Sequence, residues 1–344
     1  MTQKTALISG VTGQDGGYLA KFLLSKGYRV VGLYRRGATD TFSKLKEHGI
    51  FDQIELADFD LLEFSNICRL LIKYQPDEFY NLAAQSFVAT SWEEPIYTAQ
   101  ADGMGVLYIL EAIRQFSPKT HFYQASTSEM FGKVQAVPQT ETTPFYPRSP
   151  YGCAKLMAHW MCTNYRESFG VFACSGILFN HESPMRGKEF VTRKITAHFA
   201  EMVTGLTDKP LELGNLNAKR DWGFAGDYVE AMWLMLQQDK PDYYVVATGE
   251  THPIRDFVTE AGKVAGFDIE WQGKDENEIG IDRKTGKTVV KVNSKFFRPA
   301  EVDLLLGSPE KAEKVLGWHR KTSYADLCRL MMETDIARAK AGKL

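Results

Sequence analysis

Short apolar runs alternate along the first half of the chain with segments whose apolar residues recur every three or four positions. The first pattern is typical of buried strands and the second of amphipathic helices. The predicted strands are residues 5–9, 28–34, 54–56, 78–82, 121–125 and 171–178. The predicted helices contain residues 18–24, 67–74, about 98–115, and a segment that includes residue 151 and follows a proline-rich loop. This alternation predicts an α/β fold with a Rossmann-type doubly wound parallel sheet.

The pattern becomes looser after residue 178. Residues 180–187 are polar and irregular, so we expect a loop at the site there, and residues 268–292 resemble a peripheral excursion with a turn at 285–287 between two strands. The last twenty or so residues resemble a surface helix with a basic tail, whereas 243–247 form another short apolar run. We therefore predict a first domain, residues 1–178, joined by part of 224–250, and a smaller, mixed α/β lobe, residues 179–344.

Glycines follow the first predicted strand at Gly10, Gly13 and Gly16, and a helical pattern begins directly after them. Strand, glycine turn and helix form the context that a dinucleotide fingerprint requires. Glycines let the backbone approach a pyrophosphate, and the helix N-terminus supplies N–H donors and the positive end of the helix dipole. The sequence thus predicts a dinucleotide site at this turn.

The second predicted strand ends in Arg35 and Arg36, and the next acidic residue is Asp40. NAD-selective sites usually carry an acid at this strand end, where it binds the ribose hydroxyls, while arginine accommodates a 2′-phosphate. The cofactor predicted for the first domain is therefore NADP rather than NAD.

Tyr151 and Lys155 are four residues apart, and Thr127 and Glu129 follow the predicted strand 121–125. On a helix, such a pair shares one face, so we expect the Lys155 charge to lower the pKa of Tyr151 toward the working pH. Such a tyrosine takes a proton from an alcohol while hydride leaves the same carbon. Glu129 adds a carboxylate that alcohol oxidation does not need. This set indicates oxidation coupled to proton abstraction beside the new carbonyl.

The composition is that of a globular enzyme, with 344 residues, 44% apolar residues and a net charge of −2. We expect no nucleic-acid partner, since the chain is not basic, and no membrane span, since no apolar run is long enough. No signal peptide is visible, and the five cysteines lack C-x-x-C spacing, so we expect a reducing, cytoplasmic location with free thiols. No metal site is expected.

Longer strings carry a resemblance to a known family: residues 81–86, 122–129, 144–151, 177–184, 220–223 and 297–302. With these and the motifs above, the chain resembles the extended short-chain dehydrogenase/reductase family over essentially its whole length, and within it the GDP-mannose 4,6-dehydratases. The resemblance implies a hydro-lyase that converts GDP-mannose to GDP-4-keto-6-deoxymannose, the first step toward GDP-fucose- or GDP-rhamnose-type deoxysugars. The chain departs from the family at Met185, where a basic residue is usual.

The resemblance also implies the roles of individual residues. The catalytic residues are Thr127, Glu129, Tyr151 and Lys155. The implied NADP contacts are Gly10, Val11, Thr12, Gly13, Gln14, Asp15, Gly16, Arg35, Asp60, Leu61, Leu82, Ala83, Ala84, Gln85, Ser86, Tyr97, Lys155, His181 and Arg186. The implied contacts to the sugar nucleotide, mainly in the second lobe, are Ser86, Ser128, Asn180, Lys194, Arg220, Arg298 and Glu301.

The same residues are compatible with other functions. The chain fits a dehydratase for another sugar nucleotide such as GDP-heptose, a 4-epimerase or 4-reductase, or a non-catalytic NADP-binding sensor. The resemblance further implies a homodimer or homotetramer, with helices near 103–116 and 151–169 forming the interface and residues 35–51 reaching a neighbouring subunit.

Overall fold

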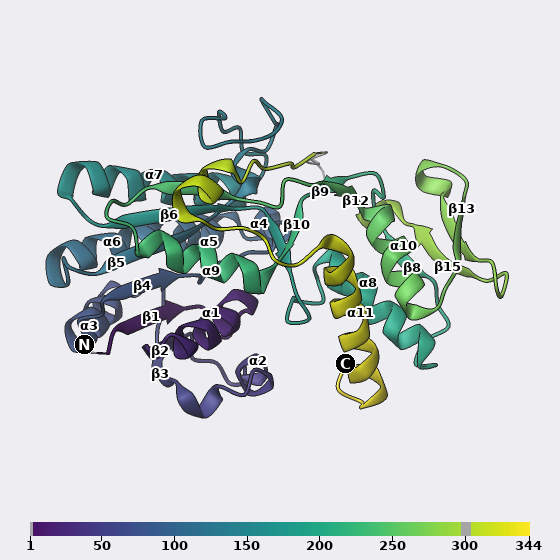
Figure 1. Ribbon diagram of the computed structural model, residues 1–344, viewed down its shortest axis with the longest axis horizontal. Helices are drawn as coiled ribbons and strands as arrows, with labels where there is room; N and C mark the ends of the chain where they lie inside the picture. The colour runs from purple at the N-terminus through teal and green to yellow at the C-terminus, as the bar shows by residue number, and fades with distance from the viewer. Residues whose placement is uncertain (1–2, 297–303) are drawn as a thin grey trace.

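The computed structural model describes residues 3–296 and 304–344. Its main element is a seven-stranded sheet in the order β11-β6-β5-β4-β1-β2-β3, and every neighbouring pair is parallel (Figure 1). The strands are β1 (Thr5–Ser9), β2 (Arg29–Tyr34), β3 (Glu55–Asp58), β4 (Glu78–Asn81), β5 (His121–Thr127), β6 (Ala173–Leu178) and β11 (Tyr243–Val246). The predicted doubly wound sheet is confirmed, with its strand order reversing between β1 and β4.

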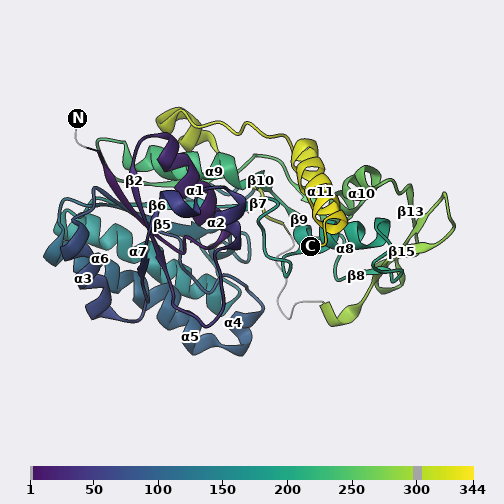
Figure 2. The ribbon, with the colours of Figure 1, turned by 90° about the horizontal axis from the view of Figure 1, so that it is seen from below.

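Helices cover both faces of this sheet, as Figure 2 shows. On one face lie α1 (Gln14–Ser25) and α9 (Ala225–Leu236), whose Leu19, Leu23 and Met232 belong to one buried cluster. On the other face lie α3 (Phe64–Tyr74), α6 (Gly105–Phe116) and α7 (Pro150–Phe169), which share a second cluster. Both faces are thus buried, which explains the continuous apolar runs of the strands.

Part of the C-terminal half belongs with this sheet. Strand β11 pairs with β6, and α9 packs in the same cluster as α1, so residues 225–246 pack with the first sheet. Ala312, Leu316 and Trp318 also pack in that cluster. The chain therefore crosses repeatedly between the two lobes, and the junction between them lies close to the carboxyl ends of the strands.

The second lobe has its own sheet, in the order β13-β14-β15-β8, covered by helices (Figure 1). Its strands are β8 (Leu211–Leu213), β13 (Ile269–Gln272), β14 (Ile279–Asp282) and β15 (Thr288–Val292), and its helices are α8 (Val191–Val203), α10 (Ile254–Ala265) and α11 (Tyr324–Lys340). The turn at 285–287 between two strands is confirmed. The description of 268–292 as a peripheral excursion is wrong, because Val289 and Val290 lie inside the lobe's core.

Two short pairings join the lobes: β7 (Asn180–Glu182) with β10 (Trp222–Phe224), and β9 (Lys219–Arg220) with β12 (His252–Pro253). The loop predicted at 180–187 is therefore partly wrong. Its first residues form a strand, and His181, Glu182, Ser183 and Met185 are buried. Their polarity misled the prediction, because buried polar groups are tolerated when they are paired, and these side chains find partners in distant elements.

The predicted surface helix at the end of the chain is also wrong. Helix α11 buries Leu327, Cys328, Met331 and Met332 in the core of the second lobe, where it packs with α8 and α10. Its sequence looks polar because only one stripe is apolar and because Asp335, which is fully buried, pairs with arginines. Helix α11 therefore forms one side of the core of the second lobe.

Shorter elements position individual residues near the site. They are α2 (Ser43–Glu47), α4 (Thr90–Glu93), α5 (Pro95–Ala99), the π-helix η2 (Gln100–Met104) and the 3₁₀ turn η3 (Ser128–Met130). The single helix predicted over about 98–115 is thus divided into α5, η2 and α6. A π-helical turn inside a helix frequently marks a functional site.

Candidate active site

The glycine turn is closely packed and leaves room only for backbone. Gly10 has a φ of +70°, and a Cβ there would lie 2.8 Å from the Ala83 nitrogen. A Cβ on Gly16 would collide with the Gly10 carbonyl oxygen. The Gly13 N–H donates to Gly10 O at 2.9 Å, and α1 begins at the next residue. This geometry fits a dinucleotide, since backbone amides and a helix N-terminus face the cavity without intervening side chains.

Residue Asp15 in this turn is bound to the second lobe. His181 Nε2 lies 2.7 Å from Asp15 Oδ2, and His181 Nδ1 lies 2.8 Å from the Phe179 carbonyl oxygen. Because both partners are acceptors, both ring nitrogens act as donors and the imidazole is cationic. Although burial opposes the charged forms, the pair raises the pKa of His181 and lowers that of Asp15. Gln14 strengthens the junction by donating to His181 O at 3.1 Å.

The predicted catalytic residues come together from two elements. Strand β5 ends at Thr127, whose Oγ1 accepts the Glu129 N–H at 3.2 Å and so caps η3. Helix α7 starts at Pro150, where the Ser149 hydroxyl accepts the Gly152 N–H at 3.0 Å. These caps fix the two chain segments whose side chains Thr127, Glu129, Tyr151 and Lys155 line one cavity.

Lys155 is buried beside Tyr151, as the helical spacing predicts. Its Nζ donates to Ala125 O at 3.1 Å and lies 5.8 Å from the centre of the Tyr151 ring. The expected lowering of the Tyr151 pKa is wrong for the protein alone, however. Burial raises that pKa, and the charges of Asp102 and Glu129 raise it further, while a hydrogen bond with Thr127 opposes the shift. The hydroxyl is therefore protonated when the site contains only protein.

Asp102 is a carboxylate of this site that the sequence analysis missed. It lies in η2 with 1% of its surface exposed, and its Oδ1 accepts the Gln85 N–H at 2.8 Å. Burial raises the pKa of Asp102 to about 6, and the charge of Lys155 opposes that shift. Burial conversely lowers the pKa of Lys155, while Asp102 opposes the change. The signal in the sequence was an acid at a core-facing position of an otherwise apolar helix.

Two cavities meet at the catalytic residues. The first, of about 180 Å³, contains the glycine turn, and the second, of about 380 Å³, extends between the lobes. Residues that line both are Ser86, Thr127, Glu129, Tyr151, Asn180 and Arg186. The reacting groups thus lie where a ligand in one cavity would touch a ligand in the other.

The structure groups most of the expected cofactor residues in the first cavity. Its lining includes Gly10, Gly13, Gln14, Asp15, Gly16, Leu82, Ala84, Ser86, Lys155, His181 and Arg186. Ser128, which was expected to contact the sugar nucleotide, also lines this cavity and is absent from the lining of the second. Val11, Ala83 and Gln85 support the turn and the β4 loop, whereas Thr12, Asp60 and Leu61 lie outside the lining. Arg35 is exposed at the end of β2 and donates to the Tyr97 hydroxyl at 2.7 Å, which joins two of the expected contacts.

The second cavity holds Asn180, Lys194 and Arg220 from the expected substrate set. Lys194 Nζ donates to Glu212 O at 2.7 Å and lies 3.6 Å from the centre of the Phe296 ring. Arg298 and Glu301 lie outside the described residues. The sequence analysis missed the apolar part of this lining, formed by Phe87, Val88, Trp92, Phe190 and Trp222, and the buried carboxylate of Glu182.

Residues 3–296 and 304–344 contain neither a metal-binding cluster nor a helix that could cross a membrane. No cluster of three or more histidine, cysteine or acidic side chains there is arranged to hold a metal ion. In the same ranges, every helix is too short or too polar to cross a membrane.

Comparison with known proteins agrees with this geometry. The family model described as GDP-mannose 4,6 dehydratase matches residues 7–331. A GDP-mannose 4,6 dehydratase of Dictyostelium discoideum is 51% identical over 349 residues, covering 99% of this chain and 98% of the relative. The GDP-mannose 4,6-dehydratase of Yersinia enterocolitica is 50% identical, covering 98% of this chain and 95% of the relative.

Among solved structures, RMD from Pseudomonas aeruginosa complexed with NADPH superimposes with a TM-score of 0.76 at 20% identity, covering 98% of this chain and 100% of that one. That likeness shows a shared fold. The family match over most of the chain and the relatives at about half identity show more: this chain belongs to the GDP-mannose 4,6-dehydratase family.

Proposed function

We propose that this protein is a hydro-lyase that converts GDP-mannose to GDP-4-keto-6-deoxymannose and water with the aid of bound NADP. One observation carries the proposal: Thr127, Glu129 and Tyr151 line both cavities, so two hydroxyl groups and one carboxylate face a single point between a dinucleotide site and a larger ligand site. Plain oxidation or reduction of an alcohol needs the hydroxyl groups and Lys155, but no carboxylate.

The glycine turn supports a dinucleotide in the first cavity, with Lys155, His181 and Arg186 at its other walls. Arg35 supports NADP over NAD. Its guanidinium is exposed at the end of β2, at the strand end where such folds recognise the ribose, and a planar cation binds a 2′-phosphate by paired hydrogen bonds. Tyr97 holds that guanidinium in place through its hydroxyl.

Thr127, Glu129 and Tyr151 each have a separate role in the proposed reaction. The glycine turn, Lys155, His181 and Arg186 would hold NADP⁺, which would supply reversible hydride transfer and a positively charged nicotinamide ring. Tyr151 takes the C4 hydroxyl proton, and Thr127 holds the C4 oxygen, since its hydroxyl already bonds to Tyr151. Once C4 is a ketone, the C5 hydrogen is acidic. Glu129 removes it and delivers a proton to the C6 hydroxyl, which leaves as water. The resulting C5–C6 double bond would take the hydride at C6 and a proton at C5, and the proton that Tyr151 took from the C4 hydroxyl balances this last proton.

Because the pKa of Tyr151 is raised, the positive charges around this residue are needed to stabilise its phenolate. In a buried site, a cation stabilises phenolate strongly, and Lys155 and Arg186 lie in the same cavity. The positively charged nicotinamide ring of NADP⁺ would add to this stabilisation. Proton transfer by Tyr151 is therefore linked to occupancy of the first cavity, and the tyrosine stays protonated while that cavity is empty.

The test is incubation of the protein with GDP-mannose and a catalytic amount of NADP, followed by mass spectrometry of the sugar nucleotide. Loss of one water without accumulation of NADPH is the expected result. Conversion of GDP-heptose but not GDP-mannose would reassign the substrate. Epimerised or reduced sugar would reject the lyase chemistry. Firm NADP binding with no reaction on any sugar nucleotide would leave a sensor.

We further propose that the protein forms a homodimer or homotetramer through α6 and α7. Phe116, Trp160 and Phe169 on these helices are 37%, 46% and 54% exposed, which is high for large apolar side chains. Light scattering during size-exclusion chromatography distinguishes the monomer from either assembly. The five cysteines are free thiols, which supports the cytoplasm as the location.

A further inference from the structure

We propose that three residues outside the site, Arg193, Asp335 and Arg338, are positioning residues that hold the segment 183–186 in its binding geometry. We call these three side chains the clasp. They come from α8 and α11, and none of them is in the lining of either cavity. The inference rests on the proposed function only in naming NADP and GDP-mannose as the ligands.

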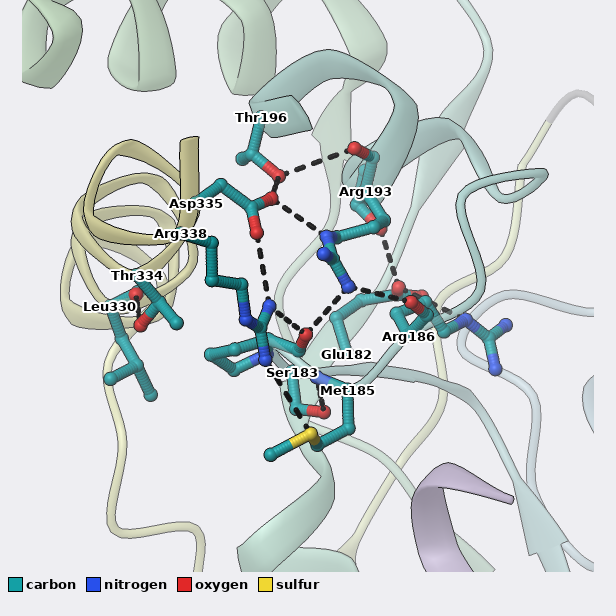
Figure 3. Close-up of polar contacts among 12 residues, drawn as sticks. Glu182, Ser183, Met185, Arg186, Arg193, Thr196, Leu330, Thr334, Asp335 and Arg338 are labelled. Carbon is teal, nitrogen blue, oxygen red and sulfur yellow. Dashed lines mark hydrogen bonds and ion pairs between the residues drawn. The ribbon is translucent and has the colours of Figure 1, made fainter. Parts of the chain in front are cut away.

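The clasp grips the backbone of the segment directly. Arg193 Nη1 donates to Pro184 O at 2.6 Å and to Arg186 O at 3.0 Å, and Arg338 Nη1 donates to Pro184 O at 2.6 Å (Figure 3). Guanidinium groups from two different helices therefore hold two neighbouring carbonyl oxygens. Each bond is charge-assisted, and such bonds are about twice as strong as neutral ones.

Asp335 aligns both arginines. Its Oδ2 accepts Arg193 Nε at 2.7 Å and the Thr196 hydroxyl at 2.7 Å, and its Oδ1 accepts Arg338 Nη1 at 3.0 Å. The carboxylate is fully buried, so it has no water to replace these partners. Removing one member of such a buried group leaves the remaining charges uncompensated. The orientation of the two guanidinium groups thus depends on one side chain of the last helix.

Arg338 extends the clasp to the first lobe. Its Nη2 and Nε lie 2.5 and 3.2 Å from Glu47 Oε1. Glu47 is the last residue of α2, which follows the strand end that carries Arg35. A single guanidinium therefore joins the last helix, the segment 183–186 and helix α2 of the first lobe.

The held segment ends in a residue of the site. Arg186 lines both cavities, its Nε lies 3.2 Å from Glu182 Oε2, and its guanidinium carbon lies 3.6 Å from the centre of the Phe190 ring. Because Arg193 bonds to the carbonyl of Arg186 itself, the clasp fixes the backbone from which this cation projects. At the other end, the Ser183 hydroxyl donates to Gln14 Oε1 at 2.7 Å, beside the glycine turn.

Met185 completes the contact and provides a separate test. It is 7% exposed, and its Sδ lies 3.6 Å from Arg338 Nη2. Met185→Ala removes this sulfur contact and leaves every clasp residue in place. We therefore expect its effect on binding to be smaller than that of Arg338→Gln.

The experiment compares Arg338→Gln, Arg338→Lys, Asp335→Asn and Met185→Ala with the control Asp326→Asn. Asp326 is near the start of the same helix and pairs with Arg329 at 2.5 Å, but it is exposed and makes no bond to the clasp or to the segment 183–186 in the contacts described above. For each variant we would measure the Kd for NADP by calorimetry, the KM and kcat with GDP-mannose, and the thermal midpoint, at a temperature where the variant is folded.

Loss of the clasp should raise the Kd for NADP and the KM for GDP-mannose on the order of tenfold, because small displacements of a positioned group are costly. The value of kcat at saturation should fall less, Arg338→Lys should recover part of the binding, and Asp326→Asn should match the wild type. A folded Arg338→Gln or Asp335→Asn protein with wild-type Kd and KM would overturn the proposal. Failure of the wild type to act on GDP-mannose would reject the proposed function alone, since the NADP titration still decides on the clasp.

Discussion

Asp15 and His181 are 166 residues apart in the sequence, yet their side chains meet at 2.7 Å between the glycine turn and strand β7. The contact joins the first turn of α1 to the point where the chain leaves the main sheet. Because both partners are titratable, the strength of this contact depends on pH.

Replacing His181 with Gln should lower stability most in a defined pH range. The raised pKa of His181 means that its contribution is complete below the ordinary value of 6.5 and is lost as pH rises through the folded value. The lowered pKa of Asp15 means that its contribution is complete above 3.8 and is lost as pH falls through the folded value. Between these two values, the variant should lose about 2 kcal/mol.

Urea unfolding of wild type and variant at a series of pH values measures this difference. His319→Gln serves as the control, because that histidine pairs with Glu313 at 3.5 Å but has 68% of its side chain exposed. A His181→Gln difference that does not shrink as pH rises past the titration of the wild-type histidine would contradict the charged pair.

Glu129→Gln should separate binding from dehydration. The amide keeps the size of the side chain but cannot remove the C5 proton, so turnover should fall by roughly 10²–10⁴-fold while the Kd for NADP stays close to that of the wild type. Mass spectrometry in heavy water gives a second readout, since deuterium should no longer enter C5. Glu333→Gln, an exposed change on α11, is the control. Product formation at the wild-type rate would remove Glu129 from the mechanism.

Arg35→Gln should weaken NADP binding and leave NAD binding nearly unchanged. Loss of one charge-assisted contact to a phosphate corresponds to roughly a tenfold to hundredfold rise in Kd. Arg36→Gln makes the same charge change one residue later and should have a smaller effect. Calorimetric titration with both dinucleotides distinguishes the two positions. Equal losses for NADP and NAD would show that Arg35 does not recognise the 2′-phosphate.

Asp102→Asn should change the pH dependence of both stability and catalysis. The pKa of the Asp102 carboxyl is raised from 3.8 to about 6. Between these two pH values the folded state keeps the proton and the unfolded state does not, so the free energy of unfolding falls as pH rises. The variant should lack that slope. Loss of a negative charge beside Lys155 should also remove the limb of the kcat/KM profile near pH 6. A profile and an unfolding curve that both match the wild type would exclude Asp102 as the titrating group.

The sequence was sufficient for the parts of the fold that depend on short-range patterns. The apolar runs of β1 and β5, the glycines at 10, 13 and 16, and the Tyr151–Lys155 spacing each identify a local geometry, and the parallel sheet brings their ends together. The grouping of Thr127, Glu129, Tyr151 and Lys155 around one cavity could be predicted for this reason, since these residues follow a strand end or share one helix face.

The parts that could not be predicted depend on distant partners. Asp335 and His181 are polar, and their burial becomes reasonable only when Arg193 and Asp15 are placed beside them. The pKa of Tyr151 depends on how much water the fold excludes, which spacing along a helix does not reveal. The division of helix 98–115 by a π-helical turn likewise follows from packing against α7 rather than from its own residues.

The place of α11 in the chain has a consequence for how the enzyme is made. Asp335 and Arg338 are translated after every strand of the main sheet and after all the residues that line the two cavities. Because domains begin to fold during synthesis, a nascent chain would form the sheet and the glycine turn before Asp335 and Arg338 are available to hold the segment 183–186. The dinucleotide site is therefore completed last, and a ribosome-bound chain that stops before Tyr324 should contain a folded sheet that does not yet hold the cofactor firmly.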